Sequence, residues 1–226
     1  MAGFDRAALL RSAPYALFIA LLALRGIAPA DGHWGFDPRW LHPLSTLLAA
    51  TMLIVWRREF GELAPQTLPS ARQALAAVAV GAAVFGAWIV LDEPWMRLGT
   101  ATAGFRPVDD TSGELLWDLA LLRWGGAALV VPVVEELFWR SFVMRWLQTP
   151  RFDALPPHHV AWRAIVLSTF LFVLTHTLWL AAAVAGLAYA LLYVRTGSLW
   201  TAVIAHAVTN GALGAWVLLT GNWGFW

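Results

Sequence analysis

Long apolar runs, each close to the length of a membrane-spanning helix, dominate this 226-residue sequence. A helix needs about 20 mostly apolar residues to cross a hydrocarbon core of about 30 Å. Short polar segments separate the runs, and the turn Arg195-Thr196-Gly197-Ser198 divides the last stretch in two. The pattern predicts an all-α, polytopic membrane protein with seven spans, at 13–30, 40–56, 72–91, 114–148, 162–178, 180–194 and 199–220.

Two of these predicted regions differ from a simple span. The run 114–148 is continuous through Pro132, so we expect one long helix with a kink at that proline. The fifth and sixth spans are short, and we expect them to form a hairpin that does not reach the outer face.

Composition supports the membrane assignment and excludes several chemistries. The chain is 60% hydrophobic and 13% charged, whereas soluble domains carry about 25% charged residues. A net charge of +1 gives no field that would favour nucleic acid. The absence of Cys excludes disulfides, thiolate metal sites and a Cys nucleophile.

The distribution of arginines predicts the orientation. With the N-terminus inside, only Arg39, Arg97 and Arg106 fall in outside segments. The arginines in inside segments are Arg6, Arg11, Arg57, Arg58, Arg72, Arg145, Arg151, Arg163 and Arg195. Positive charge collects on the cytoplasmic side of membrane proteins, so we predict an N-in topology. No linker divides the chain, and we expect one membrane domain over 1–226.

Ionisable groups within spans are costly and are candidates for function, because each costs at least ~2.5 kcal/mol near the bilayer centre. The first cluster is Glu135-Glu136, followed by Arg140. Neighbouring residues on a helix point about 100° apart, so the two glutamates should face different partners. Glu136 and Arg140 are four apart and can form an ion pair, which leaves Glu135 as the candidate general base.

Two further clusters lie in the later spans. His176 follows Phe172 by four residues, so the Phe172 ring could shield the imidazole. His206 and Asn210 are also four apart and project to one side of the last span, where two hydrogen-bond donors suit an oxyanion.

Each cluster alone has a structural interpretation, as a helix-stitching ion pair, a hydrogen-bonded core histidine or a helix–helix contact. Their concentration in the C-terminal half favours one functional site. Asp118 and Arg123 are expected to pair or to reach the interface, and Arg25 to extend its charged end there.

In order along the chain, the patterns EExxxR at Glu135–Arg140, FxxxH at Phe172–His176 and HxxxN at His206–Asn210 resemble the type II CAAX prenyl endopeptidase and bacteriocin-processing family. The overall look is close to its bacterial branch associated with exosortase systems, which implies a multi-pass protein of a bacterial or other cell membrane. The resemblance covers about 115–215, so the core would lie in 114–220, while 1–113 carries no recognised motif. Ser141 and Phe142 follow Arg140 where the family often has glycine, which leaves the helix packing there open.

The resemblance implies a role for each motif residue. Glu135 and His176 would activate the hydrolytic water, and His206 with Asn210 would stabilise the oxyanion. Glu136 and Arg140 would brace the site, and Phe172 would pack beside His176. Metal-free catalysis is favoured, with zinc held by Glu135, His176 and His206 as the alternative.

Three functions are compatible with these residues. The favoured one is an intramembrane endopeptidase opening towards the cytoplasm, with membrane lipid around it and a membrane-bound or lipidated peptide or protein as substrate. The second is a non-catalytic immunity or assembly factor that retains the site geometry. The third is a small transporter using Glu135 and His176 as proton relays, which the lack of an inverted repeat disfavours.

Overall fold

The computed structural model of the chain describes residues 6–29, 35–99 and 104–226. Within these ranges the chain is helical and forms no β-strand, only two isolated bridges, Arg97 with Leu178 and Val108 with Leu115. The helices are α1 (Arg6–Ile27), α2 (Leu41–Val55), α3 (Ala71–Val90), α4 (Trp117–Gly125), α5 (Val131–Glu136), α6 (Met144–Trp146), α7 (Trp162–Val173), α8 (Trp179–Thr196) and α9 (Leu199–Thr220). Short 3₁₀ turns occupy several of the connections, for example Gly61–Leu63 and Pro94–Met96.

The all-α membrane fold is confirmed. Each of the seven expected spans corresponds to a helix, because α4, α5 and α6 are parts of one continuous helix over Trp117–Trp146. Among the described residues, five helices are long and apolar enough to cross a membrane: α1, α3, Trp117–Trp146, α8 and α9. The other two helices, α2 with 15 residues and α7 with 12, are shorter than a full crossing. The number of crossings therefore stays a prediction.

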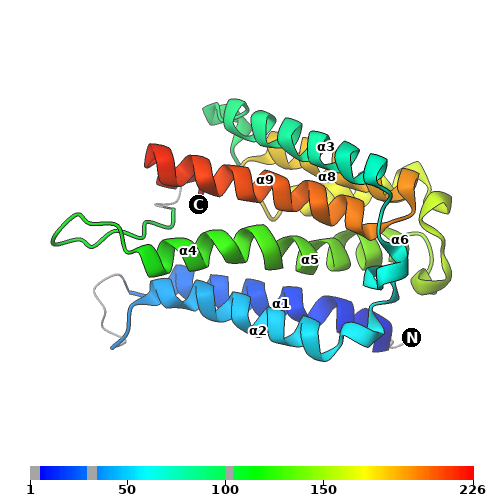
Figure 1. Cartoon of the computed structure of the whole chain (residues 1–226), viewed down its shortest axis with the longest axis horizontal. Coiled ribbons are helices and arrows are strands. Elements are labelled where there is room, and N and C mark those ends of the chain that lie inside the picture. The colour runs from blue at the N-terminus through cyan, green and yellow to red at the C-terminus, as the bar shows by residue number, and fades with distance from the viewer. Residues whose placement is uncertain (1–5, 30–34, 100–103) are drawn as a thin grey trace.

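The long helices run side by side in one bundle (Figure 1). The helix formed by α4, α5 and α6 lies between the α1–α2 pair and α9, and α3 lies beyond α9. The bundle is completed by α8, which packs against α7, α9 and α3. The motif-bearing helix is consequently covered by other helices on both sides, and Glu135, Glu136 and Arg140 are buried.

The helix formed by α4, α5 and α6, here called the central helix, changes its winding twice. Its segments Gly126–Val130 and Leu137–Val143 are π-helical, on either side of α5. Pro132 lacks an N–H and removes one i→i−4 hydrogen bond, which ordinarily bends or breaks a helix. Here the helix continues through Pro132, as expected, and the first π-helical segment lies just before it. Such segments often occur at functional sites because they turn side chains away from the regular helical spacing.

The expected span 162–178 was wrong at its C-terminal end, because α7 ends at Val173. The next amides bond three residues back, from Thr175 N to Phe172 O at 3.1 Å and from His176 N to Val173 O at 3.0 Å. The Thr175 hydroxyl also donates to the Phe172 carbonyl at 2.7 Å. Such side-chain bonds to the backbone compete with helix propagation. With a rise of 1.5 Å per residue, α7 is about 18 Å long, and His176 lies on the turn that follows it.

The connection between α2 and α3 is tied to the central helix by a buried polar cluster. Both Glu62 carboxylate oxygens accept hydrogen bonds from Arg11 of α1, each at 2.7 Å. Glu62 also accepts a hydrogen bond from the Ser141 hydroxyl, which in turn accepts one from Arg145 at 2.8 Å. Ser141 also accepts from Arg11 Nε at 3.2 Å, and it thus joins α1, the α2–α3 connection and the second π-helical segment.

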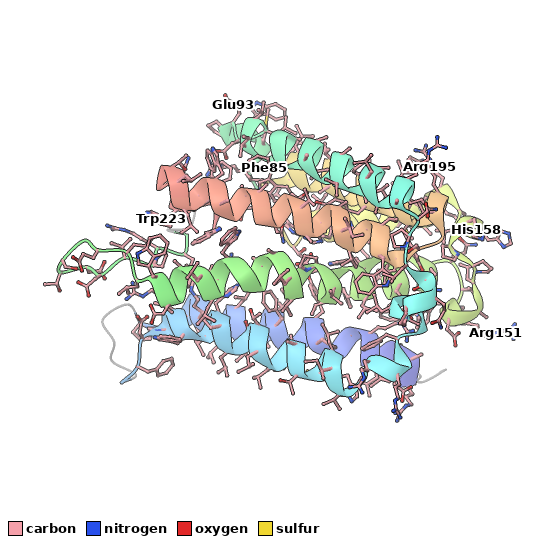
Figure 2. The ribbon with its side chains drawn as sticks, viewed as in Figure 1. Phe85, Glu93, Arg151, His158, Arg195 and Trp223 are labelled. Carbon is pink, nitrogen blue, oxygen red and sulfur yellow. The ribbon has the colours of Figure 1, made fainter. Side chains whose placement is uncertain are left out.

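The two ends of the bundle differ in charge (Figure 2). Arg151, His158 and Arg195 project from the end where the chain begins, and Glu93 projects from the opposite end. This separation follows the pattern from which the N-in topology is predicted, and the orientation itself stays a prediction.

We predict that α3 and α9 pack so closely at Gly81 that a larger side chain there lowers stability. A Cβ on Gly81 would lie 2.3 Å from the Ala205 carbonyl oxygen, whereas one on Gly86 of the same helix meets nothing within 4 Å. Gly81→Ala should therefore lower the melting temperature by roughly 3–10 °C, the range expected for overpacking. Gly86→Ala is the matched control, and thermal unfolding in detergent should show it unchanged or slightly stabilised. Equal melting temperatures would contradict the close packing of the two helices.

We also predict that the Glu62 cluster makes stability depend on acid pH. Burial alone raises the pKa of Glu62, but the hydrogen bonds and charge of Arg11 outweigh it and hold the pKa below its usual range. The stabilisation is therefore complete at neutral pH and is lost as the pH falls through the lowered pKa. Glu62→Gln should lower the melting temperature at pH 7 by roughly 6 °C or more, because one partner of a buried pair is removed.

The control for this prediction is the exposed pair of Arg6 with Glu59, whose N–O distance is also 2.7 Å. Glu59→Gln should change the melting temperature by less than about 2 °C, because exposed pairs contribute little. An equal decrease in melting temperature in both variants would show that the buried cluster stabilises the protein no more than an exposed ion pair.

Candidate active site

One cavity of about 390 Å³ contains all four residues predicted to be catalytic. Glu135 comes from α5, His176 from the turn after α7, and His206 and Asn210 from α9. Phe172, predicted to support the site, lines the same cavity. The wall also includes Tyr15, Phe18, Ile19 and Leu22 of α1 and Trp88 of α3. His42 of α2 lines it as well, so the cavity joins residues from the first three helices to motifs that are far away in sequence.

The cavity extends towards the end of the bundle opposite the Glu62 cluster. Its lining runs from Tyr15 to Arg25 along α1, from Glu135 to Arg123 along the central helix, and reaches Trp226. With the N-terminus inside, this end is external, so the cavity extends away from the expected cytoplasmic opening.

The two adjacent glutamates face different surroundings, as expected from their angular separation. Glu135 lines the cavity, and its Oε2 is buried without a hydrogen-bond partner in the described part of the chain. Glu136 is 0% exposed, and its Oε1 accepts hydrogen bonds from Arg140 Nη1 and His206 Nδ1, both at 2.9 Å. The carboxylate of Glu135 is thus available to a ligand in the cavity, while that of Glu136 is bound between helices.

Arg140 is held on three sides. Its Nη1 donates to Glu136, and its Nη2 donates to the Gly186 carbonyl of α8 at 3.4 Å. The guanidinium carbon lies 4.7 Å from the Phe172 ring centroid and 5.4 Å from that of Tyr189. Cation–π contacts of this kind are strongest where water is excluded. The expected ion pair is present, and it connects the central helix to α7, α8 and α9.

The His176 ring is fixed by the end of α7. Its Nδ1 lies 2.8 Å from the Phe172 carbonyl oxygen, and its ring centroid lies 4.2 Å from that of Phe172. A carbonyl only accepts hydrogen bonds, so we assign the proton to Nδ1. In the neutral ring, Nε2 then carries the lone pair. The expected contact with Phe172 is present, although the turn and not a helix places it.

His206 and Asn210 are each held by a hydrogen bond from one nitrogen to the central helix. His206 Nδ1 bonds to Glu136, and the ring stacks on Tyr189 with centroids 5.0 Å apart. Asn210 Nδ2 donates one of its two hydrogens to the Ala127 carbonyl at 2.9 Å. Ala127 belongs to the first π-helical segment, so the altered winding of the central helix positions the Asn210 amide.

Sequence reasoning missed several residues of the site. Tyr189 supports the His206 ring and donates its hydroxyl to Thr209 at 2.7 Å. Arg25, His42 and Arg123 line the far end of the cavity. Of the two alternatives expected for Asp118 and Arg123, the pair does not form, because Asp118 accepts from the Leu119 amide and Arg123 bonds to His42. That they reach the membrane interface stays a prediction. The sequence offered two signals for these residues, which were the polar hydroxyl of Tyr189 within an apolar span and the position of Arg25 and Arg123 near the ends of their spans.

The distances between possible ligands bear on the zinc alternative. In the ranges that the structure describes, no group of three or more His, Asp or Glu side chains lies close enough together to hold a metal ion. Structural and catalytic zinc sites need three or four such ligands. Glu135, His176 and His206 are thus not grouped as zinc ligands in this arrangement, and metal-free catalysis stays a prediction.

These observations define a multi-pass helical membrane protein with a buried Glu/His/Asn cavity. The model of the family described as Type II CAAX prenyl endopeptidase Rce1-like matches residues 117–212. This stretch contains all three motifs, and the resemblance is confirmed for it. No curated protein and no solved structure matches the chain.

The family match supports a peptidase class and a membrane environment with a peptide substrate. It covers α4 to most of α9 and leaves α1, α2 and α3 outside. The division into 1–113 and 114–220 stays a prediction, as does the exosortase-associated branch.

We predict that Glu136 and Arg140 act as one unit. Glu136→Gln leaves the Arg140 guanidinium buried, at 3% side-chain exposure, without its carboxylate. Removing one partner of a buried pair destabilises more than replacing both by apolar groups. Glu136→Gln should therefore lower the melting temperature by roughly 6 °C or more, and Glu136→Gln with Arg140→Met should recover part of that loss. Additive losses in the double variant would contradict the coupling.

Proposed function

We propose that this protein is an intramembrane endopeptidase that hydrolyses a peptide bond with a water molecule activated by Glu135. The observation that carries the proposal is the meeting of Glu135, His176, His206 and Asn210 in one cavity. A general base on one side and hydrogen-bond donors on the other are the two requirements for hydrolysing an amide.

Glu135 is the general base in this mechanism. Its unpartnered buried oxygen is free to accept a proton from a water molecule in the cavity. His176 Nε2, left as an acceptor by the bond from Nδ1 to the Phe172 carbonyl, accepts the second hydrogen of that water. The water oxygen then attacks the carbonyl carbon of the substrate, and the proton moves to Glu135.

His206 and Asn210 stabilise the oxyanion that forms. The second amide hydrogen of Asn210 is a donor already placed by the bond to Ala127. His206 donates from Nε2 when it is an imidazolium, because its Nδ1 hydrogen is directed at Glu136.

The reaction is completed by proton transfer from Glu135 to the leaving amine, which breaks the C–N bond and regenerates the carboxylate. Apolar residues of α1 such as Phe18 and Leu22 line the rest of the cavity. An apolar segment of a membrane-bound or lipidated peptide or protein suits this lining. The setting that we propose is a bacterial or other cell membrane.

The test uses the purified protein in lipid vesicles with a library of apolar peptides, read by mass spectrometry. Wild type should cleave a subset of the library, and Glu135→Gln should reduce the rate at least about 10³-fold, as expected when a general base and its water are lost. His206→Ala should cost about 10²-fold or more, the usual loss for one oxyanion donor.

Glu93→Gln is the control, because Glu93 is exposed at one end of the bundle (Figure 2). It should cleave at the wild-type rate. Full cleavage by both Glu135→Gln and His206→Ala would overturn the proposal. If no peptide is cleaved, and Glu135→Gln rescues the phenotype of cells lacking the protein, the non-catalytic immunity or assembly role replaces it.

A further inference from the structure

The far end of the cavity is basic. Arg25 near the end of α1, His42 of α2 and Arg123 of α4 all line it. Of these three, only Arg123 falls within the matched family stretch 117–212, and it belongs to none of the three motifs. The proposed catalytic groups do not use any of them, so their presence in the same cavity requires a separate explanation.

Neither arginine of this basic end has an ion pair among the described residues. Arg25 donates to the Gly104 carbonyl at 3.2 Å. Asp37 attracts Arg25 electrostatically, but the Asp37 carboxylate forms its ion pair with Arg39, at 2.7 Å. Arg123 lies close enough to Arg25 for the two charges to repel each other. Two positive charges therefore share one end of the bundle without a carboxylate in ion-pair contact with either of them among the described residues.

Several donors at this end also lack an acceptor. Arg123 Nη1 donates to His42 Nε2 at 2.8 Å, which places the His42 proton on Nδ1. His42 is 1% exposed, and both His42 Nδ1 and Arg123 Nε are buried without a partner in the described residues. Buried donors without acceptors are rare and need an explanation, such as an absent ion or ligand. An anionic group would satisfy both the charge and the donors.

Aromatic rings hold the two guanidinium groups in place. The Phe105 ring centroid lies 5.0 Å from the Arg25 guanidinium carbon and 5.8 Å from that of Arg123. The Trp226 ring lies 5.8 Å from Arg123. These contacts fix the arginines and exclude water from them, which strengthens their attraction for an anion.

The basic end and Glu135 lie along one stripe of the central helix. Arg123, Ala127, Val131 and Glu135 all line the cavity, at intervals of four residues. The π-helical segment Gly126–Val130 has more residues per turn than an α-helix, which keeps positions four apart on one face. Twelve residues rise about 18 Å, the length of about five residues of extended chain.

We propose that Arg25, His42 and Arg123 bind a carboxylate of the substrate polypeptide, about five residues from the bond that is cleaved. The carboxylate comes from the free end of the chain or from an Asp or Glu side chain. Arginine suits this ligand because its planar N–H donors match the two carboxylate oxygens. The distance of five residues has a meaning only if the protein cleaves peptides, so that part rests on the proposed function. Binding of the carboxylate can be measured without cleavage.

The first experiment measures binding to the intact protein in nanodiscs of uncharged lipid. The probes are two fluorescent pools of the same apolar peptides, one ending in a free carboxylate and one in an amide. Wild type should bind the acid pool at least about tenfold more tightly, the usual weight of a charge-assisted bidentate pair. Arg123→Gln and Arg25→Gln should each remove most of that preference. Arg106→Gln, at an exposed position, should keep it.

The second experiment separates the two sources of the carboxylate. A cleaved peptide is prepared as the free acid, as the amide, and as amides with Glu or Gln about five residues after the cleaved bond. If only the free acid binds more tightly than the plain amide, the bound carboxylate is the end of the chain. If the Glu amide binds as tightly as the free acid while the Gln amide does not, the site also accepts an acidic side chain.

The outcomes distinguish the two proposals. Equal binding of acid and amide pools by wild type overturns the carboxylate site, even if cleavage continues. An acid preference without any cleavage supports the site and contradicts the peptidase. Lipid that co-purifies with the protein gives a third outcome. If wild type retains phosphatidylglycerol and shows no acid preference, while the arginine variants no longer retain this lipid, the basic end binds a lipid headgroup and the inference is wrong.

Discussion

The carboxylate of Glu136 is the constraint on which the site depends. It is fully buried and accepts from both Arg140 and His206. A buried charge is tolerated only when it is paired and hydrogen-bonded, so the three groups must be positioned together. Arg140 in turn lies against the Phe172 and Tyr189 rings and donates to Gly186. One ion pair therefore sets the relative positions of α5, α7, α8 and α9 around the cavity.

This buried pair leaves a second carboxylate exposed to the cavity. Glu135 is adjacent in sequence, and the helical rotation of about 100° turns it away from Arg140. Its Oε2, which has no partner among the described residues, is buried, and Glu135 lines the cavity. The sequence pair EE thus separates into one group that stabilises the fold and one that is available for chemistry.

The parts of this picture that follow from local pattern could be predicted from the sequence. Hydrophobic runs located every helix, and i,i+4 spacing identified the Glu136–Arg140 pair and the His206–Asn210 pair. The end of α7 could not be predicted, because the Phe172 carbonyl is captured by Thr175 and His176 side chains. Tyr189 under His206, and the Ala127 carbonyl that holds Asn210, depend on packing between helices that no spacing encodes.

The cavity has an acidic residue at one end and basic residues at the other, with apolar residues between them. Glu135 lies at the end near the middle of the central helix, and Arg25 with Arg123 lies at the other. Because α1 and α2 supply Arg25 and His42, the helices outside the family match also shape the site. A substrate held along this axis would meet a carboxylate, an apolar stretch and a basic end in order.

The central claim is that Glu135 faces the water side of the substrate carbonyl while His206 and Asn210 face its oxygen. A structure of the protein with a phosphinic peptide, which resembles the tetrahedral intermediate, tests this most directly. We expect one phosphinyl oxygen within hydrogen-bond distance of His206 Nε2 and Asn210 Nδ2, and the other beside Glu135. A phosphinyl group bound outside the cavity, or bound in it without contact to Glu135, would contradict the account.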